Sequence, residues 1–144
     1  MDIDKGFQLE LPAVFIPWGI SEAQLHEMLQ GGPLRKITDG YFVIDCRSLG
    51  GLSHMLGFHF DHGQLVELEF FRDASSRFPD LMASFADFQR RLVIAFGAPT
   101  ETSGDHAELP ACRWIIGRTI VSHIIQERFG PEEHLRIKRS LPAT

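Results

Sequence analysis

Apolar and polar residues alternate on both sides of a single glycine, and this alternation constrains the fold more than any other feature of the chain. The stretch 58–71 reads FHFDHGQLVELEFF. If residues 61–63 form a three-residue loop with Gly63 in the left-handed conformation, the two flanking strands share one wholly apolar face. That face carries Leu56, Phe58, Phe60, Val66, Leu68 and Phe70, and the other face carries His59, Leu65, Glu67 and Glu69. A register shift by one residue would place apolar and polar residues on the same face. The pattern therefore predicts an antiparallel hairpin with one face buried from solvent.

The same stretch holds two histidines among acidic residues, which raises the hypothesis of a metal or acid–base site. Strand alternation accounts for these residues without a ligand, so we interpret the stretch as a structural hairpin. His62 is expected at the tip of the turn, and His59 on the outer face, where Glu67 or Glu69 is within reach as an ion-pair partner.

Two amphipathic segments predict helices near 21–31 and 84–97. Ser21 followed by Gln24 matches a capping box, and Ser84 is the expected N-cap of the second helix. A second hairpin is predicted around Gly117-Arg118 as a two-residue loop. Its inward face would carry Cys112, Trp114, Ile116, Val121 and His123.

The order of a helix followed by strands occurs twice, which indicates an internal αβββ duplication covering 18–71 and 84–139. Without gaps, an offset of 66 residues superposes Cys46-Arg47 on Cys112-Arg113 and gives six identities in total. We therefore expect a single α+β domain over residues 1–144. It would consist of an antiparallel sheet of six or seven strands with two helices on one face.

The segment WGISEAQLHEMLQGGP (18–33) resembles the helix signature of the BamE-like and β-lactamase-inhibitor-protein-like group. Members of that group begin this helix with glycine, a hydrophobic residue and Ser or Thr, and end it with Leu-Gly-x-Pro. This chain departs from the pattern at Gln30-Gly31-Gly32-Pro33. The resemblance implies a binding fold of tandem helix-plus-strands repeats rather than an enzyme, and it assigns no binding residues.

Charge and cysteine content narrow the classes of function. A formal net charge of −5 argues against nucleic acid and anionic membranes as partners. Two cysteines are too few for a secreted disulfide framework, the N-terminal residues lack the features of a signal peptide, and no apolar run reaches membrane-spanning length. We expect a cytoplasmic protein.

No catalytic or cofactor-binding motif is found in the sequence. Cys46 lies in the strand-like stretch YFVIDCR and is interpreted as a buried thiol rather than a nucleophile. The seven histidines show no ligand spacing, so neither a metal nor another cofactor is expected. Trp18 is interpreted as packing on the first helix, and Trp114 as a core residue.

We therefore expect a protein-binding module of the immunity or inhibitor type. A secretion chaperone and a small histidine-based enzyme or metal-binding protein are the alternatives. The predicted partner is a basic protein, and the predicted partner-binding residues are Glu67 and Glu69 on the exposed strand, with Glu132 and Glu133 at the last turn. The sequence leaves the oligomeric state open.

Overall fold

A computed structural model describes residues 1–30, 32–72, 81–103, 109–127 and 131–140. The described residues form ten strands and two helices. In chain order these are β1 (Gly6–Glu10), β2 (Ala13–Pro17), α1 (Glu22–Met28), β3 (Arg35–Thr38), β4 (Tyr41–Ser48), β5 (Leu52–Asp61), β6 (Gln64–Phe71), α2 (Leu81–Phe96), β7 (Glu101–Ser103), β8 (Ala111–Ile116), β9 (Thr119–Glu127) and β10 (Pro131–Arg139).

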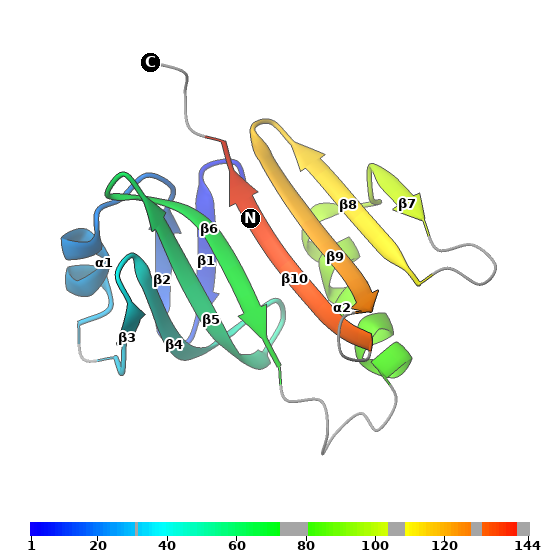
Figure 1. Cartoon of the computed structure of the whole chain (residues 1–144), viewed down its shortest axis with the longest axis horizontal. Coiled ribbons are helices and arrows are strands. Elements are labelled where there is room, and N and C mark those ends of the chain that lie inside the picture. Colours follow the sequence, from blue (N-terminus) through cyan, green and yellow to red (C-terminus); the bar gives the residue numbers. More distant parts are fainter. Residues whose placement is uncertain (31, 73–80, 104–108, 128–130, 141–144) are drawn as a thin grey trace.

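Eight of the strands form one antiparallel sheet in the order β3-β4-β5-β6-β10-β9-β8-β7, and β1 pairs with β2 in a separate hairpin. Figure 1 shows α1, the β1–β2 hairpin and α2 behind this sheet, with the hairpin between the two helices. No described helix or strand packs against the opposite face, which we call the uncovered face. The core lies between the sheet and this second layer, and includes Phe7, Leu25, Phe58, Phe88 and Trp114.

The expected fold class is wrong in two respects. The sheet has eight strands rather than six or seven, and the second layer is not simply a pair of helices, because a β-hairpin fills its middle. The prolines at positions 12 and 17 lie at the loop and at the end of this two-stranded hairpin, where a missing N–H costs little.

The N-terminal segment, which forms β1, β2 and α1, is held against the sheet by polar contacts at its ends and by apolar packing between them. Ser21 accepts a hydrogen bond from the backbone N–H of Gln24, and the side chain of Gln24 accepts one from Ser21, which confirms the capping box. The carboxylate of Glu10 accepts hydrogen bonds from the backbone N–H groups of Gly50 and Gly51 at 2.9 and 2.7 Å. These two bonds fix the β4–β5 turn against the hairpin.

The hairpin of β5 and β6 is confirmed, but its predicted register is wrong. Asp61 pairs with Gln64, so the loop has two residues, His62 and Gly63, with φ values of 50° and 75°. Both residues are left-handed, as a type I′ turn requires, and the prediction that Gly63 has a positive φ is confirmed.

A β-bulge on β6 compensates for the shorter loop. His59 pairs with Glu67 and Phe60 with Leu65, so Val66 is the extra residue. Leu65, which was expected on the outer face, is fully buried as a result.

The second helix begins earlier than expected. It starts at Leu81, so Ser84 is not its N-cap but a fully buried residue inside it, beside the buried side chains of Phe85, Phe88 and Leu92. The hairpin of β8 and β9 is confirmed as predicted, because Ile116 pairs with Thr119 across Gly117-Arg118.

Neither α1 nor α2 has the length and apolar character that a helix needs to cross a membrane, and the described residues contain no other helix.

Candidate binding site on the uncovered face

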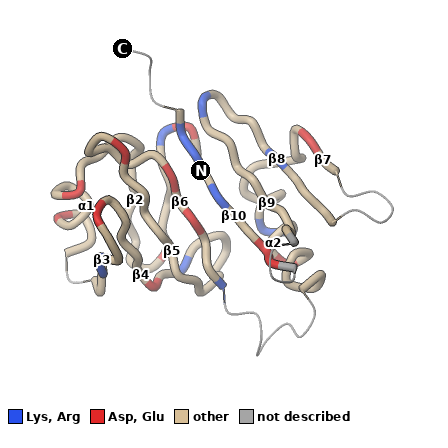
Figure 2. The backbone as a smooth tube through the Cα atoms, in the orientation of Figure 1, with Lys and Arg blue, Asp and Glu red and all other residues tan. Residues whose placement is uncertain are grey.

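The site expected from the sequence is centred on two glutamates of β6. Glu67 and Glu69 both lie on the uncovered face, where β6 runs beside β10. Lys138 is directly opposite Glu67, and Arg136 is directly opposite Glu69. Figure 2 shows the acidic positions of β6 next to the basic positions of β10, so the two strands form a seam of opposite charges in the middle of the sheet.

Arg136 binds both glutamates. Its guanidinium donates to Glu67 at 3.2 Å and to Glu69 at 3.0 Å. The second oxygen of Glu69 lies 2.9 Å from Nε2 of His59, whose ring is stacked on Tyr41 with a centroid separation of 4.3 Å. We call these five residues (Tyr41, His59, Glu67, Glu69 and Arg136) the Glu69 cluster. It confirms that His59 pairs with a glutamate, and it identifies that glutamate as Glu69.

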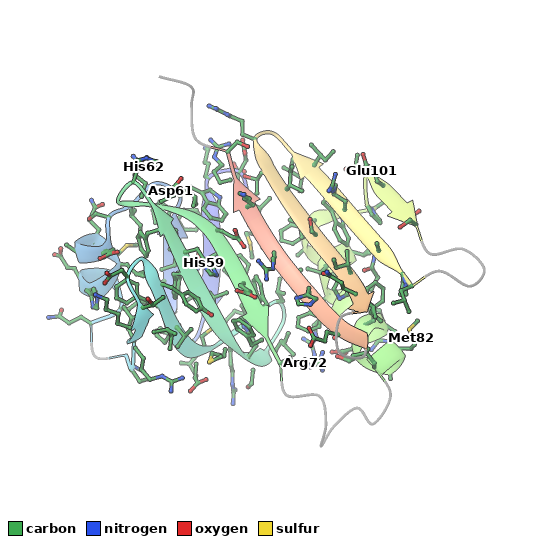
Figure 3. All side chains as sticks on the ribbon, in the orientation of Figure 1. His59, Asp61, His62, Arg72, Met82 and Glu101 are labelled. Carbon is green, nitrogen blue, oxygen red and sulfur yellow. The ribbon has the colours of Figure 1, made fainter. Side chains whose placement is uncertain are left out.

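Gly57 makes room for the aromatic part of this cluster. A Cβ atom at this position would lie 2.8 Å from Cε1 of Tyr41, which is closer than real contacts allow. The tyrosine ring therefore covers the glycine backbone, as aromatic residues often do beside a glycine in a sheet. Figure 3 labels His59 on β5, and Tyr41 of β4 is directly opposite it in the sheet.

The electrostatics of the Glu69 cluster fix the charge states of its carboxylate and its phenol. The hydrogen bond from His59 lowers the pKa of Glu69, and Arg136 adds to this effect, whereas burial opposes it. Burial and the charge of Glu69 raise the pKa of Tyr41. At neutral pH the carboxylate of Glu69 is therefore charged and the phenol of Tyr41 is protonated. Neither group has a pKa near neutral pH, which an efficient general acid or base needs.

The structure separates the other two predicted glutamates. Glu132 lies on the uncovered face, with 46% of its side chain exposed and 3.3 Å from Nε2 of His134. Glu133 points to the covered face, where its side chain is only 10% exposed. Both residues belong to β10 rather than to a turn, so Glu133 does not share a surface with the other three glutamates.

Glu133 instead joins a buried network between the sheet and α2. It accepts a hydrogen bond from Ser84 at 2.6 Å and lies 2.6 Å from Nε2 of His123. His123 is fully buried, its Nδ1 lies 2.9 Å from the side-chain oxygen of Gln89, and its ring stacks on Phe85 at 4.0 Å. These contacts hold α2 against β9 and β10, so this buried network has a structural role.

A second polar cluster is buried between β4 and β5. Nδ1 of His54 lies 3.2 Å from the carbonyl oxygen of Met55, which can only accept, so this nitrogen carries the proton. Nε2 then accepts from the hydroxyl of Ser48 at 2.5 Å, and the thiol of Cys46 lies 3.7 Å away.

This second cluster lacks an activated nucleophile. Burial raises the pKa of Cys46 to about 12 and lowers that of His54 to about 4. At neutral pH the thiol is protonated and the imidazole is uncharged, and a thiolate is the reactive form of cysteine. The interpretation of Cys46 as a buried thiol is therefore confirmed.

A cleft of about 1110 Å³ lies next to this cluster. Its walls come from the β1–β2 loop, the segment after α1 and the adjoining ends of β4, β5 and β6, and include Leu11, Met28, Arg47 and Phe71. Cys46 and His54 form part of the wall, and their protonation states leave it without a reactive pair. In the described part of the chain, no group of three or more His, Cys, Asp or Glu side chains is arranged to hold a metal ion.

Sequence reasoning missed Tyr41 and Arg136, the two residues that complete the Glu69 cluster. Tyr41 was identified only as part of the strand-like stretch YFVIDCR, and Arg136 was not singled out. Its position beside β6 depends on β10 pairing with a strand more than sixty residues earlier. Opposite charges on alternate positions of two strands would have been a usable signal, but only once the strand order was known.

Comparisons with known proteins yield one structural match. No protein-family model matches the chain, and no curated protein matches it. The solved structure of YjgB, a DUF4309 family protein from Bacillus subtilis subsp. subtilis str. 168, is similar with a TM-score of 0.45 and 13% sequence identity. The match covers 83% of this chain and 78% of YjgB. The resemblance to the BamE-like and β-lactamase-inhibitor-protein-like group stays a prediction.

Proposed function

We propose that the protein is a protein-binding module that recognises a basic partner with the Glu69 cluster and Glu132. The observation that carries this proposal is the position of the cluster on the uncovered face, which no described element covers. Proteins commonly bind partners through aromatic rings flanked by charged groups that are held rigid by the scaffold. The stacked Tyr41–His59 pair and the glutamates around Arg136 form such a surface.

The partner would need basic side chains for two reasons. Glu67 and Glu69 lie opposite the cations Lys138 and Arg136, and Glu132 adds an exposed carboxylate that leaves this part of the face with an excess of one negative charge. An arginine from a partner could contact these carboxylates and also stack on the tyrosine ring. The inhibitor or immunity role expected from the sequence is the specific form of this proposal, with a basic protein as the target.

Binding is favoured over catalysis by the state of the titratable groups. The buried cysteine and histidine beside the cleft are in their unreactive forms, and the tyrosine of the Glu69 cluster keeps its proton at neutral pH. The proposal also places the protein in the cytosol, where the two free cysteines, Cys46 and Cys112, would stay reduced.

The test begins with the full chain as bait in an extract of its native host. The recovered partner is then measured against a double variant, Glu67→Gln with Glu132→Gln. We expect association to slow at least tenfold and to lose most of its salt dependence, because these carboxylates would steer the basic partner. The matched control is Glu22→Gln with Glu27→Gln on α1, which changes the net charge equally on the covered side.

Glu133 is left out of the variant because it is buried against His123 and Ser84. Unchanged association of the Glu67/Glu132 variant would refute the proposed surface. Turnover of a small molecule by the purified chain, with no protein partner recovered, would replace the proposal by an enzymatic function.

A further inference from the structure

The outer face of α2 is largely apolar, where a surface helix normally carries charge. Between Ala83 and Ile94, the helix positions that are exposed to solvent are Ala83, Ala86, Arg90, Val93 and Ile94. Their spacing of three or four residues places them on one side of the helix, and we call these five residues the α2 outer face. Val93 is 41% exposed and Ile94 is 86% exposed. Exposed apolar groups that gather on a surface mark sites of association.

Arg90 lies between the two apolar pairs of the α2 outer face. Its side chain is 70% exposed, and its Nη2 atom donates to Oδ1 of Asp87 at 3.0 Å. The side chain of Asp87 is only 13% exposed, and it also pairs with Arg72 at 2.8 Å and with Arg91 at 3.2 Å. Three guanidinium groups therefore share one carboxylate. Along the helix, the order of the α2 outer face is apolar, cationic, apolar.

A groove of about 390 Å³ lies beside the α2 outer face. Its lining includes Arg90 and Ile94 from this face, Ala95 from the next position of the helix, Leu49 from the β4–β5 turn and Met1 from the N-terminal segment. The groove is therefore apolar at Met1, Leu49 and Ile94, with the guanidinium of Arg90 beside them. We call it the α2 groove.

The charges around the α2 groove sum to an excess of one cation. Among the residues that line it or pair with its lining, Arg72, Arg90 and Arg91 stand against Asp87 and Glu10, which is three positive charges against two negative ones. Both oxygens of Glu10 accept from backbone N–H groups of the β4–β5 turn, and Arg91 donates to two carbonyl oxygens of the same turn. Arg90 is therefore the exposed charge of this surface, in a chain whose formal net charge is −5.

We propose that the α2 outer face and the α2 groove bind an amphipathic α-helix of a partner protein that carries an acidic residue between apolar ones. The carboxylate of this helix pairs with Arg90, and its apolar residues on either side pack on the two apolar pairs. A second copy of this chain fits the surface poorly, because it would bring the same cationic excess against itself.

The shape of the surface favours a helix as the occupant. Ala83 and Ala86 are short, so a second helix can approach α2 closely, and packed helices have axes about 8–10 Å apart. An apolar side chain of the partner enters the α2 groove between Leu49 and Ile94, as anchors of a bound helix commonly do. The guanidinium of Arg90 suits a carboxylate because it can present two parallel N–H groups to it.

This inference does not rest on the proposed function. α2 lies behind the sheet in Figure 1, on the side opposite the uncovered face that carries the Glu69 cluster. The two surfaces share no residue, so either proposal can fail alone. The contact area on α2 is small, so we expect weak binding of a single helix, with a dissociation constant on the order of 100 µM.

NMR titration of the full ¹⁵N-labelled chain with a synthetic helical peptide tests the proposal. The peptide has about 18 residues, because shorter isolated helices are marginal in water, and it carries leucines on one side with glutamates between and beside them. The control peptide has lysine in place of every glutamate. We expect amide shifts in α2 and the β4–β5 turn with the glutamate peptide, and binding of the lysine peptide that is weaker by about tenfold or more.

Variants of exposed residues assign the contact. Ile94→Ser and Arg90→Gln should each weaken binding of the glutamate peptide by about fivefold or more, because they remove an apolar anchor and the pairing cation. Both side chains are mostly exposed, so the fold should be retained. The matched controls are Ile115→Ser and Arg113→Gln on β8, whose side chains are 44% and 51% exposed. These controls should bind the peptide as the unaltered chain does.

Several results would overturn the proposal. Equal binding of the two peptides would remove the role of Arg90, and shifts confined to residues outside α2 and the β4–β5 turn would place the contact elsewhere. Undiminished binding by Ile94→Ser would do the same. A dimer in sedimentation equilibrium that Ile94→Ser abolishes would assign the face to a second copy. Binding to vesicles of phosphatidylcholine and phosphatidylglycerol that Ile94→Ser abolishes, with no peptide bound, would assign it to a membrane surface.

Discussion

The buried His54 should make the stability of this protein depend on pH in a way that one substitution removes. His54 is 6% exposed, and burial lowers its pKa to about 4 from an ordinary value of 6.5. Nearby Arg72 lowers this pKa further, and the hydrogen bond to the carbonyl of Met55 only partly opposes the change. In the folded chain His54 therefore stays uncharged well below neutral pH, with Ser48 donating to its other nitrogen.

The sign of the effect follows from which state binds more protons. Between about pH 6.5 and about pH 4 the unfolded chain takes up a proton on His54 and the folded chain does not, so the free energy of unfolding falls as the pH falls. The difference between the two pKa values corresponds to about 3 kcal/mol in total. About 2 kcal/mol of this develops between about pH 7.5 and about pH 5. The contribution levels off once the pH is below the pKa of the folded state.

Urea unfolding at about pH 7.5 and about pH 5 measures this effect when wild type and His54→Gln are compared. Carboxylates and other histidines contribute equally to both proteins, so the difference between their pH dependences isolates His54. We expect the variant to lose about 2 kcal/mol less than wild type over this interval. The control is His62→Gln at the tip of the β5–β6 turn, where the side chain is 86% exposed. This control should retain the pH dependence of wild type.

Two results would refute this reasoning. The first is a His54→Gln variant whose stability changes with pH as much as that of wild type. The second is an NMR titration of the folded wild-type chain in which the His54 imidazole is protonated near its ordinary pKa. The titration needs no variant, so it decides the question even if His54→Gln folds poorly.

Three further substitutions should lower the free energy of unfolding, each measurable by urea unfolding. Gly63→Val should cost about 1–2 kcal/mol because Gly63 has a φ of 75°, and a change below about 0.3 kcal/mol would contradict this. Gly57→Ala should cost about 1–3 kcal/mol and shift the ring resonances of Tyr41, which the new methyl group would displace; unmoved resonances would argue against the contact. Ser84→Ala should cost about 1–3 kcal/mol because it leaves the buried carboxylate of Glu133 with one donor fewer, and an unaltered stability would mean that this bond is not formed.

Local features of the fold could be predicted from the sequence because their causes are local. The capping box of Ser21 and Gln24 involves residues three positions apart, and the turn at Gly117 depends on a single left-handed residue. The start of α2 was missed for a related reason. Ser84 has the chemistry of an N-cap, but its hydroxyl binds Glu133 from β10, a partner that no local pattern could indicate.

The error in the β5–β6 hairpin has a physical cause. Alternation alone cannot distinguish a three-residue loop from a two-residue loop followed by a bulge, because both return the strand to the same face at Leu68 and Phe70. The difference appears only at Leu65 and Val66. Leu65 is buried because its backbone bonds Gly19 and Ile20 of the N-terminal segment, a tertiary contact that overrides the simple pattern.

The internal duplication stays a prediction, and the sheet refines how its two halves should be compared. A helix followed by four antiparallel strands occurs twice, and the halves meet where β6 pairs with β10. An offset of 66 superposes Cys46 on Cys112, which both point to the covered face. The same offset superposes His54 on Ile120, which point to opposite faces. An offset of 67 restores the match in β9 and β10, so a comparison without gaps cannot hold along the whole chain.

The junction of β6 and β10 also explains why charge counted along the sequence was a poor guide to the charge of the proposed binding surface. Counted along the sequence, Glu67 and Glu69 belong to an acidic strand, and Arg136 and Lys138 to a basic one. The strand order places these residues opposite each other, and Arg136 then neutralises part of the acidic charge through two hydrogen bonds. Reversing Glu67 and Glu69 to lysine would therefore place four cations together and weaken the sheet as well as any interaction with a partner. Only neutral substitutions that preserve side-chain shape can separate the contribution of these residues to binding from their contribution to stability.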